Sequence, residues 1–258
     1  MRWYAVLVVV ALLFFAVESI FIIALPAGDA QITGVNVAGD LIAFCAVLAL
    51  WGLFKRIPRE FVDERRCWFL LSLGVTLHLF GDIAWSLLEI VFGDLVPVGG
   101  IVDLLYISGY LLIGAGLLLF VARVFFIERR LLSVGLSILA AMGLFVLLGI
   151  ITWGVGEGIS FVMLIQNFYV AIDVILLALM LLILIPLLGA QEHAAVFWMV
   201  FGGSFLLFLA YDLGFAFLTA KDAYFTGHII DLFYGAAYLG FVLAVAWKLK
   251  FFDRVNGK

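Results

Sequence analysis

Apolar runs of about 20 residues, each long enough to cross a bilayer as a helix, recur along almost the whole chain. The chain is 67% hydrophobic and 12% charged, and its mean hydropathy is +1.32, which excludes a soluble globular domain. Only short polar turns separate the runs. We therefore predict an all-α integral membrane protein with eight transmembrane helices. They span residues 3–25, 35–54, 67–92, 98–126, 131–153, 159–188, 194–220 and 225–250.

Basic residues lie almost entirely on one side of this predicted bundle. If successive turns alternate between the two faces, all but one of the 14 Lys and Arg residues share a face, and Lys221 is the exception. Lys and Arg are retained on the cytoplasmic side during insertion. We therefore expect a multi-pass protein of the cell membrane, with both termini in the cytoplasm. The first run is expected to remain as a helix, since it is longer than a signal-peptide core and carries Glu18.

A short polar pattern occurs twice, 128 residues apart. The pattern is D-x-x-Y-x-x-x-Y, which places an acid and two phenols on one helical face. Its two copies are Asp103, Tyr106, Tyr110 and Asp231, Tyr234, Tyr238. Asp82 and Asp212 lie in the helices that precede the two copies. We therefore predict one membrane domain made of two tandem four-helix halves, residues 1–130 and 131–258, and four hairpins in all.

Carboxyl groups are the unusual feature of the predicted spans, because no Lys or Arg lies near them. They belong to Glu18, Asp40, Asp82, Glu89, Asp103, Asp173, Asp212 and Asp231. A charge at the bilayer centre costs about 3 kcal/mol even on the permissive insertion scale, so these groups must face protein, water or a cation. Most of them lie in the outer half of the membrane. We therefore expect an outward-facing acidic and aromatic pocket that is closed toward the cytoplasm.

The predicted occupant of this pocket is a small organic cation or a metal ion. Aromatic ring faces bind organic cations, and carboxylates together with imidazole bind metal ions. The expected ligand-binding residues are Asp82, Trp85, Glu89, Asp103, Tyr106, Tyr110, Asp212, Asp231, Tyr234 and Tyr238. The expected metal ligands are His78, Asp82, Asp103 and Asp231. The sequence does not indicate a cofactor.

A structural interpretation of the same residues stays open beside this one. Each D-x-x-Y-x-x-x-Y copy could fasten helices together, with a capped Asp near a helix N-terminus accepting a hydrogen bond from a neighbouring hydroxyl. Asp40, Asp103 and Asp231 fit this interpretation as well as they fit a ligand site. His78 alone is better explained as a packing residue. The expected close contacts between helices are at Gly114, Gly116, Gly202 and Gly203.

Catalytic motifs are absent from the chain. It contains no H-E-x-x-H, G-x-S-x-G, P-loop or C-x-x-C sequence, and its 3 His are too few for a His-rich metal centre. No helix carries a Lys placed to form a retinal Schiff base. We expect neither enzymatic activity nor a nucleic-acid partner.

The segment GDIAWSLLE, the turn with Pro and Gly that follows it, and VDLLYISGYLLIGAGLLL resemble a known kind of module. They are similar to the multi-helix membrane sensor modules found N-terminal to histidine kinase and diguanylate cyclase domains in archaea and bacteria. Those modules have a similar G-D-x-x-W and a following D-x-x-Y-x-x-x-Y. The resemblance covers about 40 residues and implies that the signature positions are Asp82, Trp85, Glu89, Asp103, Tyr106 and Tyr110.

The expected function combines these observations. We expect a membrane sensor or receptor-like module that binds a cation in the outward pocket and passes helix shifts to a cytoplasmic signalling partner. The alternative is a secondary transporter, in which the same acids carry protons or sodium ions. In both hypotheses the protein is embedded in the lipid bilayer.

Overall fold

The computed structural model describes residues 2–93, 99–124, 135–140, 142–143, 161–188, 192–219, 221 and 223–255. Every regular element within these residues is helical, and none is a strand. The elements are α1 (Trp3–Ala24), α2 (Asp29–Arg56), α3 (Val62–Phe92), α4 (Ile101–Val124), α6 (Phe161–Leu184), the 3-10 turn η1 (Ile185–Leu187), α7 (Glu192–Thr219) and α8 (Asp231–Val255). Seven helices of this described part are long and apolar enough to cross a membrane. The predicted all-α class is therefore confirmed, and the apolar helices are compatible with a membrane protein.

The predicted span at residues 131–153 lies mostly outside the described residues, so the count of eight stays a prediction. Three of the described helices begin well away from the predicted residue. α2 begins at Asp29 and α3 at Val62, before their apolar runs, because a helix can continue through polar residues at the membrane surface. α8 begins at Asp231 and not at residue 225, because the backbone turns at Gly227, whose φ of 97° does not fit a right-handed helix.

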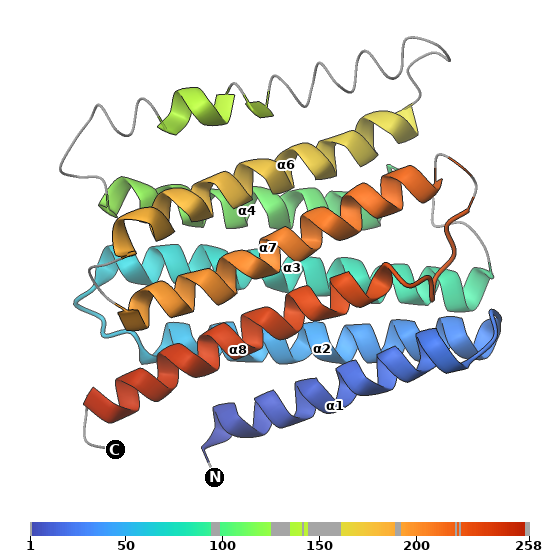
Figure 1. The fold of residues 1–258 in the computed structure, drawn as a ribbon, viewed down its shortest axis with the longest axis horizontal. Coiled ribbons are helices and arrows are strands. Elements are labelled where there is room, and N and C mark those ends of the chain that lie inside the picture. Colours follow the sequence, from blue (N-terminus) through green and yellow to red (C-terminus); the bar gives the residue numbers. More distant parts are fainter. Residues whose placement is uncertain are drawn as a thin grey trace.

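The helices form two layers. α2, α3 and α4 lie side by side in one layer, and α8, α7 and α6 lie across them in the other (Figure 1). α1 packs against both α2 and α8 at one edge. Helices that follow one another in sequence also contact one another, namely α1 with α2, α3 with α4, and α7 with α8. Because α8 contacts α1 and α2, the two ends of the chain are packed together.

An aromatic cluster joins the two layers. Trp68 of α3 is fully buried, and its ring centroid lies 5.4 Å from that of Phe120 in α4 and 5.6 Å from that of Phe197 in α7. The ammonium group of Lys248 in α8 lies 4.6 Å above the Trp68 ring and 3.4 Å from a carboxylate oxygen of Glu64. The lysine therefore has both an anionic partner and an aromatic face in a largely apolar setting.

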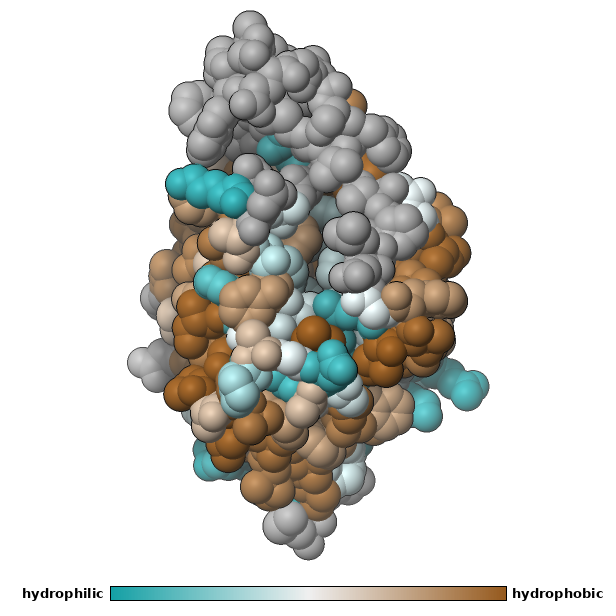
Figure 2. Space-filling view, turned by 90° about the vertical axis from the view of Figure 1, so that its right-hand side faces the viewer, coloured by the Kyte–Doolittle hydropathy of each residue, from teal (hydrophilic) through white to brown (hydrophobic). Residues whose placement is uncertain are grey.

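Asp253, near the end of α8, ties both chain ends to one end of the bundle. Its carboxylate accepts hydrogen bonds from Arg2 at 2.7 Å, from Arg56 at 3.2 Å and from the Tyr4 hydroxyl at 3.0 Å. The first residues of α1 and the last residues of α2 and α8 therefore lie together (Figure 1). Figure 2 shows the opposite end, where hydrophilic residues gather between apolar flanks. Which end faces the cytoplasm stays a prediction.

Two glycines that the sequence analysis did not select bring the backbones of α3 and α4 close together. A Cβ on Gly74 of α3 would lie 2.7 Å from the backbone oxygen of Gly109 in α4, and one on Gly109 would lie 2.8 Å from the oxygen of Gly74. Of the four glycines that were expected to allow close approach, only Gly116 faces backbone nearby, at 3.1 Å from the Cys67 oxygen. A Cβ on Gly203 would meet no atom of the described residues within 4 Å. That expectation was therefore wrong for Gly203.

Gly74→Ala is predicted to destabilise the protein by about 1–3 kcal/mol, because a backbone oxygen cannot move aside as a flexible side chain can. Thermal unfolding of the purified protein in detergent measures the effect. Gly203→Ala is the matched control and is expected to leave the midpoint unchanged or to raise it slightly. Equal effects of the two substitutions would contradict the close α3–α4 contact.

Candidate functional site

Asp82 of α3 is the centre of a hydrogen-bonded group of tyrosines. Its side chain is buried, and its Oδ1 accepts hydrogen bonds from the hydroxyls of Tyr106 at 2.7 Å and Tyr234 at 2.6 Å. Its Oδ2 accepts one from the Tyr238 hydroxyl at 2.7 Å. Three donors from α4 and α8 therefore surround one carboxylate of α3. The structure brings together residues from both copies of the D-x-x-Y-x-x-x-Y pattern.

Local sequence explains why these rings reach Asp82. Tyr234 and Tyr238 are four residues apart in α8, so their hydroxyls leave the helix on one face and lie 3.3 Å from each other. Gly81, which precedes Asp82, has no side chain, and a Cβ there would lie 2.6 Å from the ring of Tyr106. The small residue thus lets the α4 phenol lie against α3.

The acid that opens each motif copy is held by the backbone that precedes its helix. The N–H of Gly99 donates to Oδ2 of Asp103 at 2.6 Å, and the N–H of Gly227 donates to Oδ2 of Asp231 at 2.7 Å. Both glycines have positive φ, 82° and 97°, which a residue with a side chain rarely adopts. This is the capped arrangement that the structural interpretation of Asp103 and Asp231 expects.

Each capped acid also accepts a phenol hydrogen bond that the sequence analysis missed. Tyr169 of α6 donates to Oδ1 of Asp103, and Tyr224 donates to Oδ1 of Asp231 at 3.2 Å. Burial, and next the negative charge of Asp231, raise the pKa of Tyr224 well above its usual value, so this phenol stays a donor. The sequence positions of Tyr169 and Tyr224 did not indicate these hydrogen bonds.

The two capping glycines did have a signal in the sequence. Gly99 and Gly227 are 128 residues apart, the same offset as the motif itself. The repeated pattern is therefore longer than the one we used, and it reads G-x-x-x-D-x-x-Y-x-x-x-Y.

A second acidic centre lies between α6 and α7. Asp212 accepts a hydrogen bond from the Tyr110 hydroxyl of α4 at 3.2 Å. The carboxylate of Asp173 is fully buried and close enough to that of Asp212 for the two to repel each other when ionised. Neither oxygen of Asp173 accepts a hydrogen bond of good geometry from a described donor, and the side chains of Asp212 and Tyr110 are the polar groups within reach of it. Asp173 was not among the predicted ligand-binding residues.

Two glutamates complete the acidic network. Glu89 accepts hydrogen bonds from the Asn36 amide at 2.7 Å and from the Thr226 hydroxyl at 2.6 Å. Glu18 of α1 is 2% exposed, and its Oε2 has no hydrogen-bond partner in the described part of the chain. Residue 235 in α8 is glycine, and Oε2 of Glu18 lies in the space that a side chain at this position would fill.

The expected metal site is not assembled in this structure. Asp82, Asp103 and Asp231 accept hydrogen bonds from different tyrosines and glycines, so their oxygens are directed at separate partners. His78 is buried, with its ring centroid 4.4 Å from that of Tyr110 and against the bare backbone of Gly109. Over the residues that the structure describes, no three His, Cys, Asp or Glu side chains lie close enough to hold a metal ion.

Two cavities in the described part of the protein lie away from the acids. One has a volume of about 460 Å³ and lies among apolar residues of α4 and α6 and residues 136, 139, 140 and 143, with Tyr110 at its wall. The other has about 420 Å³ and lies at the basic end of the bundle. None of the membrane-embedded acids lines either cavity. Trp85, predicted to contact a cation, is half-buried and packs at 6.2 Å from the ring of Phe215.

Comparison of the chain with models of known families, with curated proteins and with solved structures found no significant match. The resemblance to sensor modules therefore stays a prediction. What the fold itself defines is a bundle of apolar helices, compatible with a multi-pass membrane protein, with acids and tyrosines in its interior.

Tyr238→Phe is predicted to destabilise the protein by about 1–3 kcal/mol, because Tyr238 is the sole described donor to Oδ2 of Asp82. Tyr106→Phe is predicted to cost about 1 kcal/mol or less, because Oδ1 keeps the bond from Tyr234. Unfolding titrations in mixed detergent micelles measure both. A larger loss for Tyr106→Phe than for Tyr238→Phe would contradict this assignment of donors.

Proposed function

We propose that this protein is a membrane sensor or receptor-like module whose ligand is a proton or a small inorganic cation. The observation that carries the proposal is the fully buried carboxyl group of Asp173, which lies against the carboxyl group of Asp212, with the Tyr110 hydroxyl as its only nearby donor among the described residues. An ionised carboxylate in such a place costs several kcal/mol unless it is paired. A proton or a sodium ion shared with Asp212 removes that cost.

A small ligand fits the geometry better than the organic cation that the sequence first indicated. A site for an organic ligand is usually a cavity of several hundred cubic ångströms that covers most of the ligand surface. The oxygens of Asp82, Asp103 and Asp231 already accept hydrogen bonds from phenols and backbone. A proton or a single ion between Asp173 and Asp212 needs no such cavity.

The hydrogen bonds around this pair provide a route for a helix response. Asp212 of α7 is bonded to Tyr110 of α4, and Tyr106, one turn earlier in α4, is bonded to Asp82 of α3. Asp82 is in turn bonded to Tyr238 of α8. Adding a proton or a cation changes which oxygens accept hydrogen bonds, so it favours one of two alternative helix arrangements. The end of α8 at the basic rim would report the shift to a signalling partner.

The proposed topology has eight crossings of the cell membrane, with both termini in the cytoplasm. α4 ends and α7 begins at the end of the bundle that holds both termini, while α6 begins at the other end (Figure 1). We therefore propose an eighth crossing between α4 and α6, which would carry the chain from the end where α4 stops to the end where α6 begins. The excess of Lys and Arg at the terminal end supports a cytoplasmic position for it, and the resemblance to sensor modules supports the functional class.

A secondary transporter driven by protons or sodium ions is the second candidate. The observation in its favour is that, among the described residues, buried carboxyl oxygens without a hydrogen bond of good geometry occur at two places, Oε2 of Glu18 in α1 and both oxygens of Asp173 in α6. Two such places could bind one ion in succession. Proton-driven or sodium-driven uptake into proteoliposomes would support this candidate over the sensor.

The sensor proposal is tested by the distance between spin labels at the basic rim. Labels are placed at the exposed positions Lys55 and Lys250 through Lys→Cys substitutions, and the protein is reconstituted in nanodiscs. Cys45 and Cys67 are buried, which favours selective labelling. The interlabel distance is expected to change between mildly acidic and mildly alkaline pH, or on addition of sodium chloride.

Asp173→Asn is expected to abolish this distance change, because the amide cannot take up a proton or pair with a cation. The matched control is Asp29→Asn at the exposed start of α2, which is expected to behave like the unmutated protein. A distance change that persists in Asp173→Asn, or the absence of any change before mutation, would rule out the proposal.

A further inference from the structure

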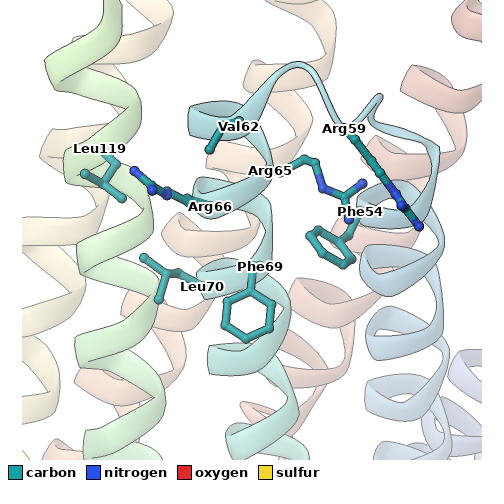
Figure 3. A pocket seen from close by; sticks show the side chains of 8 residues that line it. All are labelled: Phe54, Arg59, Val62, Arg65, Arg66, Phe69, Leu70 and Leu119. Carbon is teal, nitrogen blue, oxygen red and sulfur yellow. The ribbon is translucent and has the colours of Figure 1, made fainter.

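A groove at the basic end of the bundle combines arginines with an apolar wall. It lies where α2 ends, α3 begins and α4 passes, and its volume is about 420 Å³ (Figure 3). Its charged side chains are Arg59, Arg65 and Arg66. The other described residues that line it are Phe54, Val62, Phe69, Leu70 and Leu119, and none of these described lining residues is acidic.

One of the three arginines is held in place by the protein itself. A guanidinium nitrogen of Arg65 donates to the backbone oxygen of Ile57 at 2.7 Å, and the guanidinium lies 4.5 Å above the Phe54 ring. Arg65 therefore keeps a fixed positive charge at the wall of the groove. Its role is to support the corner between α2 and α3 as well as to contribute charge.

The guanidinium groups of the other two arginines are available to bind an anion. A guanidinium nitrogen of Arg66 lies 3.7 Å from a carboxylate oxygen of Asp63. Because the two side chains are 70% and 77% exposed, this ion pair contributes little to stability. Arg59 is exposed and has no hydrogen bond or ion pair with another described residue. A guanidinium binds phosphate through two parallel hydrogen bonds, which makes arginine the preferred side chain for that group.

The apolar wall continues from the arginines toward the membrane. Phe69 of α3 and Leu119 of α4 are 42% and 44% exposed, and both helices are long and apolar enough to span a bilayer. Figure 3 shows Phe69 and Leu70 further along α3 than the arginine side chains, on the side away from the turn. A bound molecule would therefore meet positive charge at its head and hydrocarbon along its tail.

We propose that this groove is a binding site for an anionic phospholipid. The headgroup phosphate pairs with Arg59 and Arg66, and an acyl chain lies along Phe69 and Leu119. Charge complementarity selects the anion, and the exposed apolar wall selects a lipid over a soluble phosphate. The site is independent of the acidic network, since it lies on the lipid-facing surface and shares no residue with it.

Native mass spectrometry of the full chain in detergent tests the proposal. Phosphatidylglycerol and phosphatidylcholine with the same acyl chains are the probes. The unmutated protein is expected to retain the anionic lipid in preference to the neutral one. The double variant Arg59→Gln/Arg66→Gln is expected to lose the preference, by roughly fivefold for each charge removed.

The matched control removes the same charge from the same rim, through Lys250→Gln/Arg254→Gln, whose side chains do not line the groove. It is expected to keep the preference. If the control loses as much as the groove variant, the attraction belongs to the whole rim and the site is refuted. Soluble glycerol phosphate that displaces the lipid at equal concentration would refute the lipid as occupant, as would equal retention of both lipids by the unmutated protein. If the double variant unfolds during purification, the single variant Arg59→Gln is tested for the same loss of preference for the anionic lipid.

Discussion

The hydrogen bond between a buried carboxylate and a phenol of another helix is the interaction on which this bundle depends. In lipid, apolar side chains gain little by leaving one apolar surface for another, so polar contacts and close backbone packing decide which helices meet. Asp82 joins α3 to α4 and α8 through three tyrosine hydroxyls. Asp212 joins α7 to α4 through Tyr110. Without these partners each carboxylate would face hydrocarbon, at a cost that few single contacts could offset.

The two ends of the bundle are held by different chemistry. At the end with the termini, Asp253 and Glu64 pair with arginine and lysine side chains, and Arg59, Arg65 and Arg66 border a groove. Deeper in the described part of the bundle, tyrosine hydroxyls and backbone N–H groups take the place of these cations as partners of the acids. Ion pairs therefore hold the end with the termini together, while neutral donors satisfy most of the acids inside. Among the buried carboxyl oxygens of the described residues, those of Asp173 and one of Glu18 lack a hydrogen bond of good geometry.

Much of the fold could be predicted from the sequence, and less of the site. The apolar runs predicted the helices because length and hydropathy are local properties of the chain. The Asp and Tyr positions of the repeated motif were identified because they share a helical face. The Gly74–Gly109 contact was missed, since many glycines occur in the chain and only the packed helices show which two face each other. The pocket expected among the acids stays a prediction, because the sequence could not show that tyrosine hydroxyls donate to both oxygens of Asp82.

What the sequence by itself determined is that the chain is a bundle of apolar helices whose interior contains carboxyl groups needing partners. What only the tertiary structure decided is which partner each one receives. Tyr106 and Tyr110 lie one turn apart in α4, yet the first donates to Asp82 of α3 and the second to Asp212 of α7. Spacing along a helix fixes the direction of a side chain, but the identity of the acceptor depends on how α3, α4 and α7 cross, which is a property of the packed bundle.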